Sequence, residues 1–208
     1  MSPVGPAYRI VTERLELRCW EPADAFELKR AIDSSLDHLR PWMPWAAQEP
    51  EPLEDKVERL RSFRALFDRD EDYIYGIFER RDGRVAGGTG LHLRHGPNAR
   101  EIGYWLRADR EGQGLMSETV AALTKVSFEV DGVRWVEIRC QPENERSAAV
   151  PRRLGFSHEA TLAARVDDPL YGAPRDLEVF TMMRDAYDRS ACAGAALEAY
   201  DAAGARLI

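Results

Sequence analysis

Two glycines separated by one residue stand where a short apolar run gives way to a helical pattern. Residues 102–106 have strand character, a polar turn with Gly112 and Gly114 follows, and a helical pattern opens at Met116 and runs to about Val130. The first amides of a helix lack intrahelical partners and carry a partial positive charge. Glycine lets an anion approach the backbone closely. This order of strand, glycine turn and helix predicts a site for a ligand that carries a pyrophosphate.

The composition is that of an ordinary soluble globular domain. The 208 residues are 44% hydrophobic and 31% charged, which suffices for one domain with a real core. The formal net charge of −7 argues against a surface that wraps nucleic acid, because such surfaces carry a basic excess. It weakly favours a cationic partner, such as an amine or a basic peptide.

Signals for export or membrane insertion are not found in the sequence. No stretch approaches the roughly 20 apolar residues of a membrane helix, and the first residues show no secretory signal pattern. Cys19, Cys140 and Cys192 are too few and too scattered for a disulfide framework or a zinc site. We therefore expect a cytoplasmic protein without a membrane or nucleic-acid partner.

The apolar periodicity changes along the chain. Alternating or continuous apolar runs predict strands at 11–20, 73–79, 85–93, 101–106, 134–140, 156–166 and 177–183. Helical spacing predicts helices that begin near Asp24, after Pro52, at Met116 and at Ala148. Gly155 is placed to end the last of these as a left-handed cap. The connector 39–45 cannot be a regular helix, because Pro41 and Pro44 interrupt it.

The order of these elements predicts a mixed sheet. Strands before the glycine turn are joined by short turns, such as Asp82-Gly83, and are expected to be antiparallel neighbours. The helix after the glycine turn is a crossover, so the strand 134–140 is expected to run parallel to its predecessor. Residues 185–208 are alanine-rich, which predicts a further helix or a tail beyond a domain of residues 1–184.

With these elements in order, the chain resembles the GNAT superfamily of N-acetyltransferases, and within it the RimJ/RimL-type enzymes, which include ribosomal-protein-alanine N-acetyltransferases. The likeness spans roughly Tyr8–Met183 and depends on five ordered motifs. These are Thr12-Glu13-Arg14-Leu15; Leu39-Arg40-Pro41-Trp42; Glu101-Ile102-Gly103-Tyr104-Trp105-Leu106; Gly112-Gln113-Gly114-Leu115-Met116-Ser117-Glu118; and Asn144-Glu145-Arg146-Ser147 with Leu154-Gly155-Phe156. The resemblance implies an α+β fold (α/β by some schemes): a mixed, mostly antiparallel sheet of about seven strands, flanked by helices, with acetyl-CoA in a cleft between splayed strands.

The resemblance also implies an enzyme. It would transfer the acetyl group of acetyl-CoA to a primary amine by direct attack, with the N-terminal α-amine of a protein or peptide as the first expectation. Two alternatives stay open at this stage. One is N-acetylation of a small amine, such as an aminoacyl conjugate or an amine antibiotic, and the other is a non-catalytic module that binds acyl-CoA. Homodimerisation, for example through residues 185–208, also stays open.

Residues that match the family's coenzyme motifs are expected to bind acetyl-CoA. They are Trp105, Leu106, Arg107, Gly112, Gln113, Gly114, Leu115, Met116, Ser117 and Asn144. A bulge where the strand splays from its neighbour would free backbone groups for the coenzyme, and the Leu106 amide is the candidate donor to the oxyanion. Glu111 departs from the family, which usually has a basic residue just before the first glycine. Electrostatic help would then have to come from Arg107 or Arg110.

Ser147 matches the serine that RimL-like enzymes are taken to use as the acid that protonates the coenzyme A sulfur. The alternative is that Ser147 N-caps the helix 148–154.

Trp42 and Trp45 lie on the proline-interrupted connector, which borders the acceptor side in this family. We expect them to form a wall for the substrate, with core packing as the alternative. No metal-like clustering links the histidines, so surface or packing roles are expected for them and no metal site is predicted. They are His38, His92, His95 and His158.

The general base is the least determined part of the site. The RimL-like pattern places a glutamate late in the strand 156–166, but Arg165 or Val166 stands there. Asp167 and Asp168 follow directly and could substitute, although they also suit a plain loop. Glu101, on the strand that leads to the site, is the other candidate and would act through water.

A dinucleotide-binding oxidoreductase is the rival from another class. Gly112, Gly114 and Ser117 come close to the pattern Gly-x-Gly-x-x-Gly, but a lone near-match is weak. A Rossmann unit repeats strand, helix and strand, whereas an antiparallel run precedes the turn in this chain. The element order therefore favours the acetyltransferase.

Overall fold

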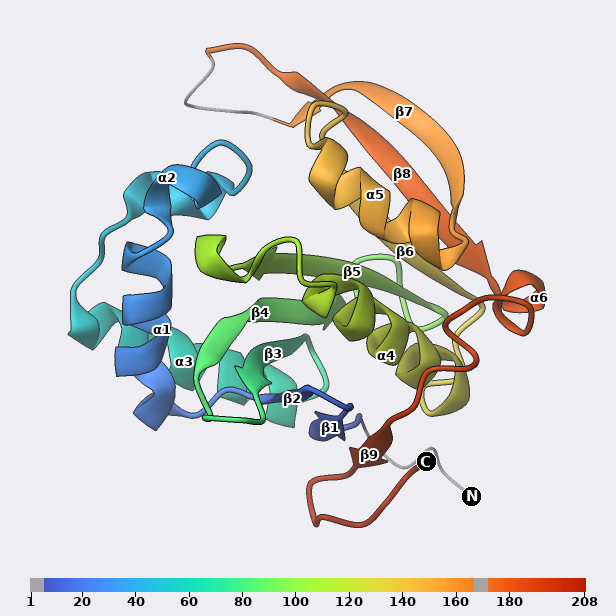
Figure 1. The fold of residues 1–208 in the computed structure, drawn as a ribbon, viewed down its shortest axis with the longest axis horizontal. Helices are drawn as coiled ribbons and strands as arrows, with labels where there is room; N and C mark the ends of the chain where they lie inside the picture. Colours follow the sequence, from blue (N-terminus) through green and yellow to red (C-terminus); the bar gives the residue numbers. More distant parts are fainter. Residues whose placement is uncertain (1–5, 167–171) are drawn as a thin grey trace.

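The computed structural model describes residues 6–166 and 172–208, and a sheet of nine strands organises this part of the chain. The strands are β1 (Arg9–Val11), β2 (Leu15–Cys19), β3 (Tyr73–Glu79), β4 (Val85–His92), β5 (Ala99–Leu106), β6 (Trp135–Cys140), β7 (Ser157–Val166), β8 (Arg175–Met183) and β9 (Glu198–Tyr200). Their order across the sheet is β7-β8-β6-β5-β4-β3-β2-β1-β9 (Figure 1). Neighbours are antiparallel except β5 and β6, which are parallel as predicted.

Helices flank this sheet and complete the predicted architecture (Figure 1). The α-helices are α1 (Ala25–Asp33), α2 (Leu36–Leu39), α3 (Leu53–Asp68), α4 (Leu115–Glu129), α5 (Glu145–Leu154) and α6 (Arg184–Tyr187), and the 3-10 turns are η1 (Pro22–Asp24), η2 (Pro44–Gln48) and η3 (Ala108–Arg110). Gly155 ends α5 with a φ of 88°, which confirms the predicted left-handed cap. Within the described ranges, no helix is both long and apolar enough to cross a bilayer.

Alternation along the strands divides the apolar side chains between two faces. On β3, Tyr75 and Ile77 belong to a large cluster that α4 and α5 also supply, whereas Phe78 belongs to a smaller cluster with α1 and α3. Successive side chains of a strand point to opposite faces, so α1 and α3 cover one face and α4 and α5 the other. The central strands β3 and β4 are therefore buried on both faces.

The sheet is wider than the sequence predicts, for two local reasons. The predicted strand 11–20 is shortened to β2, and residues 9–11 before it form β1 and pair with it as a hairpin. The chain turns between them because the buried Thr12 hydroxyl accepts a hydrogen bond from the Leu15 amide at 3.1 Å. Residues 185–208 are not helical beyond α6. They fold along the sheet edge, where β9 pairs with β1, and both Cys192 and Ala199 are fully buried. Tertiary packing here overrides the helix propensity of alanine.

The parallel pair at the centre of the sheet comes apart after three residues. Ala99–Glu101 of β5 pair with Trp135–Glu137 of β6, while residues 138–140 of β6 pair only with β8. The remaining part of β5 pairs with β4 alone. This is the predicted splay, and it leaves one edge of residues 102–106 without a strand partner.

A carboxylate ties the first hairpin to the start of α4. Glu118, in the first turn of α4, accepts hydrogen bonds from the Thr12 hydroxyl (2.6 Å) and from the Arg14 side chain (2.6 Å). Arg14 also donates to the Gln113 carbonyl at 2.8 Å, so the glycine turn is held at the same point. Burial works to raise the pKa of Glu118, but the hydrogen bonds from Thr12 and Arg14 outweigh it and lower the pKa below its ordinary value.

We predict that Glu118→Gln destabilises the protein by about 1–3 kcal/mol at pH 7, because it removes charged hydrogen bonds. The folded pKa of Glu118 lies below the unfolded one, so its contribution is complete above the unfolded pKa near ~4.3 and disappears as the pH falls through the folded pKa. Urea unfolding at pH 7 and at decreasing acidic pH measures the difference. Glu58→Gln, which affects an exposed pair with Arg61, is the control and should change little. A difference that stays constant at low pH would contradict the assignment.

Candidate active site

The glycine turn after β5 has the geometry of an anion site. Gly112 and Gly114 adopt φ angles of 70° and 76°, which favour glycine, and Gly114 is the N-cap of α4. The first hydrogen bond of the helix runs from the Glu118 amide to the Gly114 carbonyl at 3.1 Å. The amides of residues 115–117 therefore precede the hydrogen-bonded ladder and point out of the helix end. A Cβ placed on Gly112 would meet nothing within 4 Å, so the space beside the turn is open.

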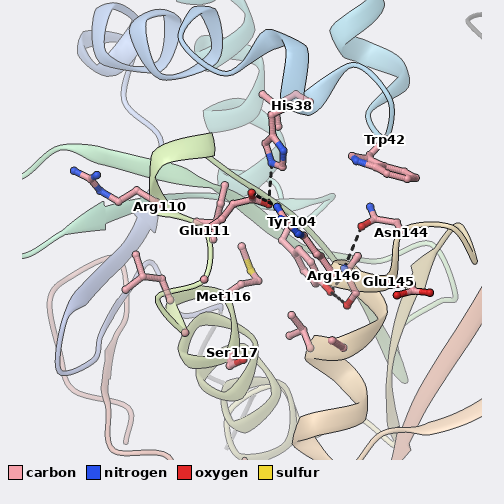
Figure 2. A pocket seen from close by; sticks show the side chains of 18 of the residues that line it. His38, Trp42, Tyr104, Arg110, Glu111, Met116, Ser117, Asn144, Glu145 and Arg146 are labelled. Carbon is pink, nitrogen blue, oxygen red and sulfur yellow. Dashed lines mark hydrogen bonds and ion pairs between the residues drawn. The ribbon is translucent and has the colours of Figure 1, made fainter.

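This turn opens onto a first cavity of about 810 Å³, shown in Figure 2. The connector after α1, the strand β5, the glycine turn, the start of α4 and the start of α5 line it. Members of this lining are His38, Trp42, Met43, Tyr104, Leu106, Arg110, Glu111, Gly112, Gly114, Leu115, Met116, Ser117, Asn144, Arg146, Ser147 and Arg153. Most of the predicted coenzyme residues thus lie around one cavity.

Basic side chains reach this cavity from α5. Arg153 donates to the Ser117 hydroxyl at 2.9 Å, and Arg146 forms an ion pair with Glu111. His38 Nε2 lies 3.4 Å from the other oxygen of Glu111, so this carboxylate bridges α2 and α5 at the cavity (Figure 2). The sequence prediction named Arg107 and Arg110 as sources of positive charge and missed Arg146 and Arg153. Their seven-residue spacing, which places both on one helix face, was the available signal.

Three predicted coenzyme residues have side chains outside the first cavity, in the part of the chain that the structure describes. Arg107 pairs with Asp109 at 2.8 Å, and the Gln113 amide donates to the Asp109 carbonyl at 3.1 Å. The Trp105 ring lies on the opposite face of β5, 5.9 Å from the Trp45 ring. Strand alternation explains the last result, because Trp105 and Leu106 must point to opposite faces.

A second cavity, of about 800 Å³, lies on that opposite face. Its lining contains Trp45 and Trp105 together with His92, Arg94, His95, Glu101 and Arg139. The two cavities share Trp42, Met43, Tyr104, Asn144 and Ser147. They therefore meet beside β5, where the strand has left β6. Trp42 borders both cavities, and Trp45 borders the second.

Ser147 lies at this junction and does not cap the helix. The N-cap of α5 is Asn144, whose side chain accepts a hydrogen bond from the Ser147 amide at 3.1 Å (Figure 2), so the capping alternative is wrong. The Ser147 hydroxyl donates to the Tyr104 oxygen at 3.2 Å, and the Tyr104 hydroxyl donates to the Ser147 carbonyl at 3.0 Å. Burial raises the pKa of Tyr104 well above its usual range, so the phenol stays protonated. Tyr104 was not predicted as a site residue.

The backbone of β5 offers donors at the same place. The Arg107 amide donates to the Ala86 carbonyl of β4 at 2.8 Å. The amides of an antiparallel strand point alternately to its two edges. The amides of Tyr104 and Leu106 therefore point away from β4, to the edge of β5 that no longer pairs with β6. This orientation agrees with the predicted role of the Leu106 amide.

Glu101, the predicted base, is buried at the wall of the second cavity. One of its oxygens accepts from Arg94, and the other lies 3.1 Å from His95 Nε2. Arg139 on β6 is 3.8 Å away. The carboxylate is thus surrounded by cationic or titratable donors. Asp167 and Asp168, the substitutes considered for the base, lie outside the described residues.

Comparison with known proteins identifies the class. A model of the acetyltransferase (GNAT) domain matches residues 14–157, which is more than half of the chain. The chain therefore belongs to the GNAT acetyltransferase family, and the predicted fold class and enzyme class are confirmed.

Individual relatives point in the same direction. The chain is 29% identical over 182 residues to the Bacillus subtilis (strain 168) protein YdaF, whose name proposes a ribosomal N-acetyltransferase; the match covers 84% of this chain and 93% of that one. It is 24% identical over 156 residues to the [ribosomal protein uS5]-alanine N-acetyltransferase of Escherichia coli (strain K12), covering 74% and 80% of the two chains. A solved structure of RimL, a ribosomal L7/L12 α-N-protein acetyltransferase in complex with coenzyme A, superposes with a TM-score of 0.76 at 26% identity, covering 85% of this chain and 97% of RimL.

We predict that Gly114→Val weakens coenzyme A binding by roughly tenfold or more, because the side chain intrudes at the turn and strains its left-handed backbone. Titration calorimetry with coenzyme A measures the affinity, and circular dichroism checks that the variant is folded. Gly83→Val is the matched control. The φ of Gly83 is 70°, close to the 76° of Gly114, and Gly83 lies in the hairpin between β3 and β4, so the variant carries similar strain without touching the cavity. Equal affinities for Gly114→Val and the native chain would refute the assignment of the turn.

Proposed function

We propose that the chain transfers the acetyl group of acetyl-CoA to the N-terminal α-amine of a protein or peptide. The observation that carries the proposal is that the two cavities, one on each face of the sheet, meet at Tyr104 and Ser147. A coenzyme that enters from the glycine turn and an amine that enters from the opposite face would meet at this point. Such an arrangement suits direct attack, because no enzyme nucleophile has to carry the acetyl group between two sites.

The residues of the first cavity fit acetyl-CoA. The amides of residues 115–117 and the open space beside Gly112 suit a pyrophosphate. Arg153 supplies positive charge beside the turn, while Arg146 offsets the carboxylate of Glu111. The free edge of β5 offers amides to the pantetheine arm. Bound acetyl-CoA supplies an electrophilic thioester carbonyl and a thiolate leaving group.

The chain's own groups then have separate tasks. The Leu106 amide is directed to the free edge of β5 and would donate to the thioester oxygen as negative charge develops on it. The Ser147 hydroxyl would give its proton to the departing sulfur. Tyr104 would hold Ser147 in place through its two hydrogen bonds. Trp42 and Trp45 would form the wall against which the acceptor lies.

Two observations favour an α-amine as the acceptor. Relatives over most of the chain carry names that refer to ribosomal proteins or to the α-amine of a protein. An α-amine has a pKa near ~8 and is already partly neutral at pH 7, so it needs only modest assistance with deprotonation.

We place the enzyme in the cytoplasm, where the free, buried Cys19, Cys140 and Cys192 would stay reduced.

Thiol release from acetyl-CoA tests the proposed function. The panel contains peptides with a free α-amine, the same peptides with a blocked N-terminus and an internal lysine, and small amines. We expect turnover with the free peptides alone, with mass spectrometry locating the acetyl group on the first residue. Turnover of small amines without peptides would favour the small-molecule acetyltransferase. Binding of acetyl-CoA without turnover of any amine would favour the non-catalytic module.

We predict that Ser147→Ala lowers kcat by about 10²-fold while coenzyme affinity changes little, since a proton donor acts in the transition state more than in the bound state. Steady-state kinetics with the best acceptor of the panel and calorimetry with coenzyme A measure the two quantities. Ser62→Ala is the control, because its hydroxyl bonds to the Glu58 carbonyl on the exposed surface of α3. An unchanged kcat would remove Ser147 from the mechanism.

A further inference from the structure

The ring of His92 lines the second cavity and lies over two glycines that pair with each other in neighbouring strands. Gly90 of β4 and Gly103 of β5 stand opposite each other in the ladder. A Cβ on Gly90 would lie 2.8 Å from His92 Nε2, and a Cβ on Gly103 would lie 3.1 Å from the same atom. The ring occupies this place because neither glycine has a side chain. Nε2 thereby lies over Gly103, on the strand whose other edge is free.

A carboxylate orients this ring. Asp72, just before β3, places its two oxygens 2.8 and 3.0 Å from His92 Nδ1. A carboxylate accepts hydrogen bonds, so in the neutral ring the proton belongs on Nδ1 and the lone pair on Nε2. The side chain of His92 is 15% exposed and lines the cavity that the proposed function assigns to the acceptor. An oriented imidazole with a free lone pair at such a place has the arrangement of a general base.

We propose that His92 is the catalytic base for the acceptor amine and that Asp72 is its positioning residue; this inference rests on the proposed function. The ammonium form of the acceptor gives one proton to His92 Nε2, which becomes an imidazolium. The neutral amine then forms the C–N bond to the acetyl carbon, and the C–S bond breaks. The second proton from nitrogen reaches the sulfur through the Ser147 hydroxyl, which gives one proton and takes one. The imidazolium finally releases its proton to solvent, so one proton is released per turnover.

Glu101 is less suited to this task, although it borders the same cavity. Both of its oxygens are already occupied, one by Arg94 and the other by His95. A proton on this carboxylate would have to displace one of these donors, whereas Nε2 of His92 needs no such exchange. The charged or titratable side chains that share the second cavity with His92, apart from Asp72 behind the ring, are Glu49, Lys56, Arg59, Arg94, His95, Glu101, Tyr104, Arg139 and Cys140.

Nuclear magnetic resonance of the histidine ring nitrogens tests the orientation without coenzyme and without activity. We expect the neutral ring of His92 to carry its proton on Nδ1. In Asp72→Asn we expect the ring either to change its tautomer or to exchange its N–H proton with solvent at a different rate. The signal is assigned by its loss in His92→Gln, and His158, an exposed histidine on β7, serves as the internal control. A native His92 with its proton on Nε2 would overturn the proposal. This measurement stays valid if the proposed acetyl transfer is wrong.

Kinetics across pH test the proton transfer. At pH 7 we expect His92→Gln to lower kcat/KM for the acceptor by about tenfold, because only about a tenth of an amine with a pKa near ~8 is neutral at that pH. Coenzyme affinity should be unchanged, and Asp72→Asn should lower kcat/KM less. The deficit should shrink toward ~pH 9.5, because an amine with a pKa near ~8 is then neutral without help. A merely structural defect would not recover with pH.

Glu101→Gln and His158→Gln are the comparison variants, and Asp72→Asn keeps the ring in place if His92→Gln folds poorly. A deficit in His92→Gln that does not change with pH, or a pH-dependent deficit found in Glu101→Gln instead, would overturn the role of His92. A native protein that acetylates nothing in the panel would contradict the proposed function and leave the orientation to be decided by the ring spectra.

Discussion

The separation of β5 from β6 is the constraint on which the rest of the structure depends. Parallel strands normally pair along their length, and an unpaired strand edge inside a protein leaves polar backbone groups that need partners. Here the pairing ends at Glu101, and the free edge of β5 faces the place where two cavities meet. A ligand that brings its own hydrogen-bonding groups is the natural partner for such an edge. The family's coenzyme, with the amides of its pantetheine arm, is a ligand of this kind.

Charged groups secure the elements on either side of this opening. Glu118 joins the first hairpin to the start of α4 through Thr12 and Arg14, so the helix end that faces the first cavity is fixed by a segment distant in sequence. Glu111 takes the place of the usual basic residue and binds Arg146 instead. The charges of Glu111 and Arg146 offset each other, so the unfavourable carboxylate is neutralised. Arg153 of α5, which donates to the Ser117 hydroxyl, adds a positive charge at the start of α4.

Glycines in β4 serve a different purpose from those in the turn. A glycine inside a strand usually weakens it, yet β4 carries Gly87, Gly88 and Gly90, and the last two have an aromatic ring above them. The Trp105 ring lies over Gly88, and the His92 ring lies over Gly90 and its partner Gly103. The flat surface that results lets an indole and an imidazole line the second cavity. The glycines weaken the strand locally, and they make room for the two rings that line the second cavity.

The sequence by itself determined the elements that local periodicity and turn chemistry encode: the strands, the main helices, the glycine turn, the crossover and, through five ordered motifs, the family. It could not decide that residues 185–208 supply β9, because that strand depends on a partner, β1, at the other end of the chain. The Asn144 cap of α5 is a local signal that the sequence carried. The sequence could not show that Asp72 and His92, which are twenty residues apart, come into contact. Contacts of this kind arise only when the strands are in register, since packing and burial, rather than local propensity, select them.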